Sequence, residues 1–149
     1  MIKQIMVTTD FSKCGNEAVD YGFNLAKQVG ASVILISVIE REKHESIYFI
    51  DMKPLEDSGK AKQAETQAET FMKNLVPPQC ADVPHTLDAV IANDADEGID
   101  QAVDKYKPDL LIISGHGYSG FKKFLLGSTT DRVLRCVECP VLVIKAKGE

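Results

Sequence analysis

Apolar positions along the chain form short continuous runs that are separated by stretches with helical spacing. The runs lie at residues 2–8, 33–39, 85–91, 110–113 and 141–144, and they are rich in β-branched side chains. Continuous apolar strands are typical of parallel sheets, which are buried on both faces. We therefore predict five strands at these positions.

Between the runs, apolar residues recur at the three- and four-residue intervals of amphipathic helices. This spacing predicts helices over residues 13–29 and 60–75, a third that carries Ile99 to Tyr106 and a last one that carries Thr130 to Val137. Strands that alternate with helices favour an α/β fold, a doubly wound parallel sheet with helices on both faces. The length of 149 residues suits one domain over residues 1–149.

Local signals predict several helix ends and buried faces. Gly30 follows the first helix, where a left-handed glycine commonly ends the last turn. Asp94 and Glu97 have the spacing of a capping box at the start of the third helix. The predicted apolar faces include Val29, Phe71 and Leu134. Residues 40–59 break the rhythm, and we expect a long excursion that acts as a lid or an interface segment.

Charge and composition narrow the classes of function. Lys and Arg number 17 against 22 Asp and Glu, a net charge of −5, which disfavours nucleic acid as a partner. Residues 117–149 are nevertheless basic, with six Lys or Arg against three Asp or Glu. This local charge indicates a small anionic ligand near the C-terminal third, or only the ordinary scatter of charge over a surface.

The start of the chain and its cysteines predict a compartment. Residues 1–3 lead directly into an apolar strand pattern without the profile of a secretory signal, and the run at 33–39 is too short to span a bilayer. The four cysteines suit free thiols in a reducing compartment. We therefore expect a cytoplasmic protein that does not insert into membranes.

Candidate chemistry gathers where predicted strands end. Ligands of open parallel sheets bind beyond the carboxyl ends of the strands, at the point where the strand order reverses. Residues 8–12, 37–40 and 114–120 follow three of the strands, and the last of these segments holds three glycines. Residues 127–130, Gly-Ser-Thr-Thr, open the last helix, where free N–H groups and the helix dipole favour phosphate. Together these segments predict a binding site for a di- or triphosphate. The alternative interpretation is that the glycines only form ordinary turns.

These segments resemble the universal stress protein family. Its nucleotide-binding branch carries G-x2-G-x9-G-[S/T] after the fourth strand, and here Gly117, nine residues and Gly127-Ser128 match, with Ser114 in place of the first glycine. Residues 8–12 resemble the family's P-x-D-x-S, with Thr8 in place of proline, and residues 139–144 resemble its closing segment. The resemblance covers nearly the whole chain.

The resemblance implies a fold, a ligand and an assembly. The fold is adenine nucleotide alpha hydrolase-like, a five-stranded sheet in order 3-2-1-4-5, and the assembly is a homodimer joined through strand 5. The ligand is ATP, or ADP or AMP, with Mg²⁺ as an accompanying ion and Asp10 as its candidate neighbour. The implied nucleotide-binding residues are Thr8, Thr9, Asp10, Val38, Ile113, Ser114, His116, Gly117, Gly127, Ser128, Thr129 and Thr130.

The resemblance also implies individual roles for these residues. Asp10 would hold the ribose hydroxyls, and the backbone of Val38 would contact adenine. Ser114 and Gly117 would flank ribose and phosphate. Phosphates would bind the N–H groups of Gly127, Ser128 and Thr129, with hydroxyl groups from Ser128 and Thr130.

Each candidate residue also has a plainer interpretation. Asp10 suits a carboxylate that stabilises the start of a helix, and His116 suits either a phosphate contact, a general base or a solvated loop residue. Cys136 and Cys139 form a C-x2-C pair, but it closes a helix rather than opening one, where the dipole would lower a thiol pKa.

The sequence thus predicts an ATP-binding stress-response protein that acts as a nucleotide-dependent switch or sensor. Any ATP hydrolysis is expected to be slow, because no strong catalytic base accompanies the motif. The main alternative is a nucleotide-free dimeric interaction protein, in which Ser114 spoils the pocket. A thiol redox module based on Cys136 and Cys139 is a third class.

Overall fold

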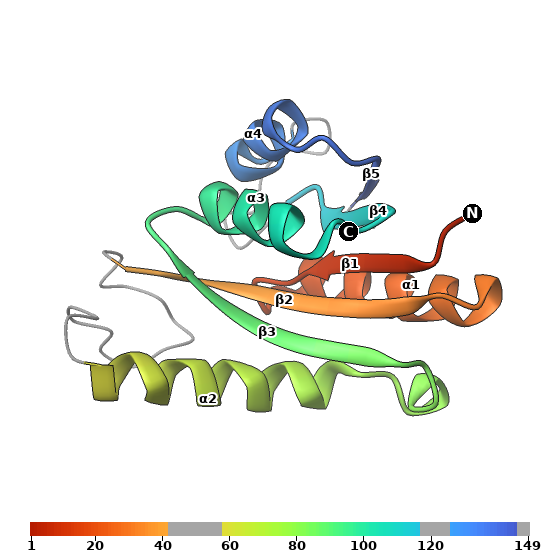
Figure 1. Cartoon of the computed structure of the whole chain (residues 1–149), viewed down its shortest axis with the longest axis horizontal. Coiled ribbons are helices and arrows are strands. Elements are labelled where there is room, and N and C mark those ends of the chain that lie inside the picture. Colours follow the sequence, from red (N-terminus) through yellow and green to blue (C-terminus); the bar gives the residue numbers. More distant parts are fainter. Residues whose placement is uncertain (42–57, 117–125, 146–149) are drawn as a thin grey trace.

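The protein folds around one five-stranded parallel sheet (Figure 1). The computed structural model describes residues 1–41, 58–116 and 126–145. The strand order is β3-β2-β1-β4-β5, as predicted. All four pairings are parallel. The strands are β1 (Gln4–Thr8), β2 (Ser32–Glu40), β3 (His85–Ala92), β4 (Leu110–Ser114) and β5 (Val141–Ile144).

Helices cover both faces of the sheet (Figure 1). On one face lie α1 (Lys13–Val29) and α2 (Ser58–Leu75), and a short 3₁₀ turn, η1 (Pro78–Cys80), leads from α2 into β3. On the other face lie α3 (Ala95–Tyr106) and α4 (Ser128–Cys136). The prediction of a doubly wound α/β fold is therefore confirmed.

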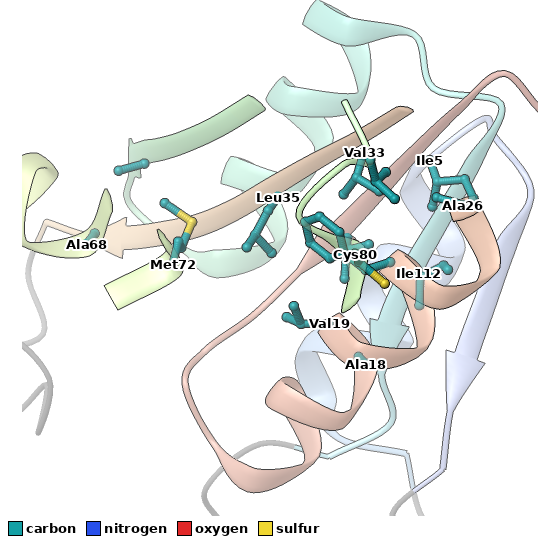
Figure 2. Close-up of a cluster of buried hydrophobic side chains, with 14 of the residues drawn as sticks. Ile5, Ala18, Val19, Ala26, Val33, Leu35, Ala68, Met72, Cys80 and Ile112 are labelled. Carbon is teal, nitrogen blue, oxygen red and sulfur yellow. The ribbon is translucent and has the colours of Figure 1, made fainter. Parts of the chain in front are cut away.

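Two hydrophobic cores sandwich the sheet, because successive strand residues point to opposite faces. Ile5 and Val7 of β1 join the cluster under α1 and α2, whereas Met6 joins the cluster under α3 and α4. Figure 2 shows the first cluster, in which Leu35 of β2 lies among side chains from α1 and α2. The continuous apolar runs of the sequence follow from this double burial.

Some local signals are confirmed and one is wrong. Gly30 ends α1 in the left-handed conformation with φ of 75°, as predicted. Asp94 is the N-cap of α3, but its side chain makes no capping hydrogen bond, so the predicted capping box does not form. Asp94 is exposed, so its carboxylate does not need a backbone partner to replace solvent. The side-chain cap lies instead on α1, where the Gly15 N–H donates to Ser12 Oγ at 3.0 Å.

Three predicted core positions are exposed, and the predicted end of the excursion at residues 40–59 differs from the structure. The exposed fractions are 46% for Val29, 41% for Phe71 and 40% for Leu134. Each lies at the border of an apolar stripe, beyond the arc of the helix that the sheet covers. The predicted excursion at 40–59 is too long at its end, because α2 begins at Ser58. Residues 42–57 lie outside the described residues.

Asp109 ties the start of β4 to the start of β1. Its Oδ2 accepts the N–H groups of Lys3 and Gln4 at 2.8 and 3.0 Å, and its own N–H donates to the Gln4 carbonyl at 2.9 Å. The two backbone N–H groups hold the pKa of the Asp109 carboxyl below its usual range, because they favour the charged form.

We expect Asp109→Asn to lower the free energy of unfolding at neutral pH. The folded-state pKa of Asp109 is depressed, so its contribution is present above the unfolded pKa of about 4 and is lost as pH falls through the folded pKa. Urea unfolding at about pH 7 and at about pH 3 tests this, with the difference from wild type shrinking at the lower pH.

Asp104→Asn is the matched control, since the Asp104 carboxylate lies in an exposed pair with Lys107, and such pairs contribute little to stability. Equal destabilisation by the two substitutions would contradict the role given to the Asp109 carboxylate. So would a difference in free energy of unfolding between Asp109→Asn and wild type that grows as the pH falls.

Candidate functional site

The reversal of strand order lies between β1 and β4. The connection from β1 runs through α1 on one face of the sheet, and the connection from β4 runs towards α4 on the other face. The segments that follow β1 and β4 therefore leave the sheet in opposite directions. Such a divergence is where open parallel sheets bind ligands. The residues after β1 and after β4 are therefore the first candidates for a site.

The segment after β1 is held by short-range hydrogen bonds. Thr9 is buried, and its Oγ1 accepts the Phe11 N–H at 3.0 Å, while its backbone N–H donates to the Ile36 carbonyl at 3.0 Å. Asp10 is exposed, and its Oδ1 accepts the Ser12 N–H at 3.0 Å and also the Ser12 hydroxyl. The loop thus presents one carboxylate in a fixed position at the end of the central strand.

Two features of this loop are unusual. Phe11 has φ of 65°, a conformation that is strained by about 1–2 kcal/mol for a residue with a Cβ. Gly15 lies so close beneath the loop that a Cβ there would come within 2.6 Å of Asp10 Oδ1 and 3.1 Å of Thr9 Oγ1. The first turn of α1 therefore packs directly against Asp10, which a larger residue at position 15 would displace.

The segment after β4 is joined to the start of α4 by two hydrogen bonds. Thr130 is buried, and its hydroxyl donates to the Ser114 carbonyl at 2.8 Å. The Gly127 N–H donates to the Gly115 carbonyl, also at 2.8 Å. These bonds bring together the two halves of the glycine pattern, although Gly117, one of its members, lies outside the described residues.

Ser114 adopts ordinary strand backbone as the last residue of β4. Among the described non-glycine residues, only Phe11 and Lys107 have positive φ. A side chain at position 114 therefore introduces no backbone strain where the family pattern has glycine.

The N-terminus of α4 presents backbone donors beside these segments. Gly127 is its N-cap without a side-chain capping bond, and the Asp131 N–H is the first to donate back, to the Gly127 carbonyl at 3.0 Å. The N–H groups of Ser128, Thr129 and Thr130 precede it and have no acceptor within the helix. Together with the helix dipole, they favour an anion at this position.

The remaining predicted residues lie around this edge in different environments. Val38, near the end of β2, is half-buried, and a Cβ on Gly98 would come within 2.6 Å of its Cγ1. Thr8 is buried as the last residue of β1. Ile113 is buried in the core beneath α4, so only its backbone can reach a ligand.

His116 follows Gly115 and lies beside the N-cap of α4. The position of a Cβ on Gly127 is 4.0 Å from His116 Cα. The ring atom Nδ1 is buried without a hydrogen-bond partner among the described residues. The backbone of His116 therefore lies beside the start of α4, and its ring carries one buried polar atom.

Comparison with known proteins assigns the family. The family model described as "Universal stress protein family" matches residues 1–145. The chain belongs to the universal stress protein family. Universal stress protein MJ0577 of Methanocaldococcus jannaschii is 30% identical, over 99% of this chain and 98% of the relative. A solved structure of MJ0577 superimposes with a TM-score of 0.76, covering 100% of this chain and 99% of that one.

Two more distant universal stress proteins share the fold and were solved as nucleotide complexes. One, in complex with cAMP, has a TM-score of 0.67 at 19% identity, and the alignment covers 98% of this chain and 99% of that one. The other, from Archaeoglobus fulgidus in complex with dAMP, has a TM-score of 0.59 at 14% identity, with 97% and 98% covered.

Within this universal stress protein fold, three further residues shape the site: Ser12, which the sequence indicated only as part of the P-x-D-x-S match, and Gly15 and Gly98, which were missed. Ser12 anchors Asp10 and caps α1, Gly15 allows α1 to approach the loop, and Gly98 allows α3 to approach Val38. The D-x-S spacing of Asp10 and Ser12 is a signal for the first. No sequence signal distinguishes the two glycines, because the close contacts arise between separate elements.

The C-x2-C pair does not have the features of an activated thiol pair. Cys136 is exposed at the last position of α4, and Cys139 is half-buried. Burial raises the pKa of the Cys139 thiol, whereas a reactive thiol needs a lowered one. Within the described ranges, no group of three or more His, Cys, Asp or Glu side chains is arranged to hold a metal ion.

We expect Thr130→Val to destabilise the protein by about 1–2 kcal/mol, because the substitution leaves the Ser114 carbonyl without its donor. Chemical denaturation measures the change. Thr129→Val makes the same replacement one residue earlier, at a half-buried position of the same helical turn, and we expect a smaller effect there. A loss that is equal in both variants would show that the Thr130–Ser114 bond contributes nothing specific.

Proposed function

We propose that this universal stress protein binds ATP, or the related nucleotides ADP and AMP, at the edge of the sheet between β1 and β4. One observation carries the proposal. A fixed, exposed carboxylate at Asp10 and the open N-terminus of α4 both border the point where the strand order reverses. A carboxylate suits ribose hydroxyls, and a helix N-terminus suits phosphates.

The proposed roles follow the chemistry of each group. Asp10 accepts hydrogen bonds from the ribose hydroxyls, and Thr8 and Thr9 shape the loop that carries it. Adenine lies by Val38, whose half-buried side chain and neighbouring backbone offer an apolar wall with polar groups. Ile113 and Ser114 border the ribose through their backbone, together with Gly117.

Phosphates bind at the start of α4 in this proposal. Gly127, Ser128 and Thr129 supply backbone N–H groups, and Ser128 adds an exposed hydroxyl. The hydroxyl proton of Thr130 is already donated to Ser114, so Thr130 contributes its N–H group and holds the two segments together. His116 lies beside the N-cap and adds a polar contact to the phosphate chain.

The structural neighbours support the class of ligand. Two universal stress proteins of the same fold bind cAMP and dAMP, which share the adenine ring and one phosphate. A helix N-terminus next to a glycine-rich segment, in a part of the chain that carries net positive charge, suits a longer phosphate chain. Mg²⁺ would bind together with the phosphate groups of the nucleotide, and Asp10 is the candidate carboxylate beside it.

We further propose that binding, not turnover, is the main activity. Phosphoryl transfer requires a positioned nucleophile and metal-held charge. In this proposal Asp10 holds Ser12 through Oδ1 and also accepts the ribose hydroxyls, which leaves it poorly placed to activate water, so any hydrolysis is slow. A cytoplasmic switch or sensor of adenine nucleotide, active in a stress response, fits these properties. Among the described residues, no helix is long and apolar enough to cross a bilayer.

The proposal predicts that Gly127→Leu strongly weakens ATP binding. The backbone at Gly127, with φ of −61° and ψ of 154°, accepts any residue, and a Cβ would touch the Gly115 carbonyl at an ordinary 3.4 Å. The variant should therefore fold while its side chain obstructs the phosphates. Calorimetric titration with Mg²⁺ and ATP should show at least a tenfold loss, about 1.4 kcal/mol or more.

Gly30→Ala controls for lost stability, because Gly30 has positive φ and lies at the far end of α1. It should destabilise the fold and keep wild-type affinity for ATP. Unchanged affinity for ATP in Gly127→Leu would refute the placement of the phosphates at the start of α4. Wild-type protein that shows no binding at millimolar ATP would refute the proposed nucleotide binding.

The proposed assembly is a homodimer through β5. This strand is an edge of the sheet, and its four residues, Val141 to Ile144, are apolar and only half-buried. Apolar edges invite pairing with another strand, so a second copy of the chain is a suitable cover. This edge also favours the alternative function, a dimeric interaction protein without nucleotide.

We expect Val143→Glu to convert a dimer into a monomer. Val143 is half-buried at the β5 edge and packs partly against the cluster under α3 and α4, so pairing of β5 with a second copy would have to bury the new carboxylate without a partner. Light scattering after size exclusion should give twice the 16.4 kDa of one chain for wild type and a single-chain mass for the variant.

Leu134→Glu places the same charge at an exposed position of α4 and should remain dimeric. Wild-type protein with a single-chain mass would contradict the assembly. A dimer that fails to bind ATP would favour the nucleotide-free alternative.

A further inference from the structure

The aromatic ring of Phe71 packs on the loop that carries Asp10. Phe71 belongs to α2, and its ring lies 5.6 Å from the ring of Phe11, centroid to centroid, with the planes tilted by 56°. Phe11 follows Asp10 directly in the chain and has a φ of 65°. A helix that is distant in sequence thus contacts the residue next to the proposed ribose ligand.

The unusual backbone of Phe11 is linked to the position of the Asp10 carboxylate. The turn at Phe11 brings the Ser12 N–H to Asp10 Oδ1, while the Phe11 N–H donates to Thr9 Oγ1. A bulky residue keeps positive φ only where its surroundings hold it there. The contact between the two rings is one such restraint, because aromatic pairs at this separation attract each other.

The exposure of Phe71 separates this contact from ordinary core packing. The buried face of α2 consists of Ala64, Ala68 and Met72, whereas Phe71 is partly exposed at its border. Phe11 is half-buried and packs at the edge of the same cluster. Removal of the Phe71 ring should therefore leave the core intact and release the loop.

We infer that Phe71 is a positioning residue, which acts through the ring and backbone of Phe11 to hold the Asp10 carboxylate for the ribose hydroxyls. This inference rests on the proposed function and adds α2 to the elements that control the site. The ring of Phe71 restrains Phe11, the turn at Phe11 keeps Ser12 on Asp10, and the fixed carboxylate recognises the sugar. Loss of the ring selectively weakens ribose recognition and spares base and phosphate contacts.

The experiment compares ATP with 2′,3′-dideoxy-ATP, which lacks both ribose hydroxyls. Calorimetric titrations of wild type, Asp10→Ala and Phe71→Ala give the ratio of the two dissociation constants. Asp10→Ala should bring the ratio to about one by weakening ATP binding about 10- to 100-fold. Phe71→Ala should weaken ATP binding at least about threefold and leave dideoxy-ATP binding unchanged.

Two variants make the comparison specific. Phe71→Tyr keeps the ring and should retain the wild-type ratio. Glu69→Ala alters an exposed residue of the same helix and should also retain it. A wild-type ratio in Phe71→Ala, or an equal loss for both nucleotides, would overturn the positioning role.

A second measurement does not depend on nucleotide. Hydrogen exchange of the Ser12 amide, followed by NMR, reports its bond to Asp10 Oδ1. Phe71→Ala should accelerate exchange at Ser12 and leave the amides of β1 protected. Unchanged exchange at Ser12 would overturn the inference even if ATP binds. If Phe71→Ala accelerates exchange at Ser12 but the wild-type protein does not bind ATP, only the proposed function is overturned.

Discussion

Burial of β1 on both faces is the constraint on which the rest of the structure depends. Ile5, Met6 and Val7 are fully buried, so helices must cover both sides of the central strand. Because crossovers between parallel strands are right-handed, the chain leaves β1 for β2 on one face and returns to β4 by the other. The reversal of strand order between β1 and β4, and with it the candidate site, is a consequence of this burial.

The same architecture explains why an acidic protein can present an anion site. The net charge is −5, yet the donors at the start of α4 are backbone N–H groups, which a count of charged residues does not include. Two hydrogen bonds, from Thr130 to Ser114 and from Gly127 to Gly115, place these donors next to the end of β4. Local helix geometry and tertiary packing together produce the electrostatics of the site.

Much of the fold was predictable from sequence, since it depends on periodicity. The strands at 33–39 and 85–91 were placed to within a residue at each end, and the glycine that ends α1 was identified by its position. Helix faces were less predictable, because periodicity defines the centre of an apolar stripe but not its border. Val29 and Phe71 continue the stripes of their helices, yet both are exposed.

The sequence by itself determined the order of elements, the parallel sheet and the family, because these follow from apolar spacing and from the motif around Gly127 and Ser128. It also indicated Asp10, whose place at a strand end is local information. Only the tertiary structure decided how Asp10 is held. Gly15 beneath it and Phe71 beside Phe11 act through contacts between separate elements. Such contacts depend on how helices pack against the loop, and this packing leaves no periodic signal along the chain.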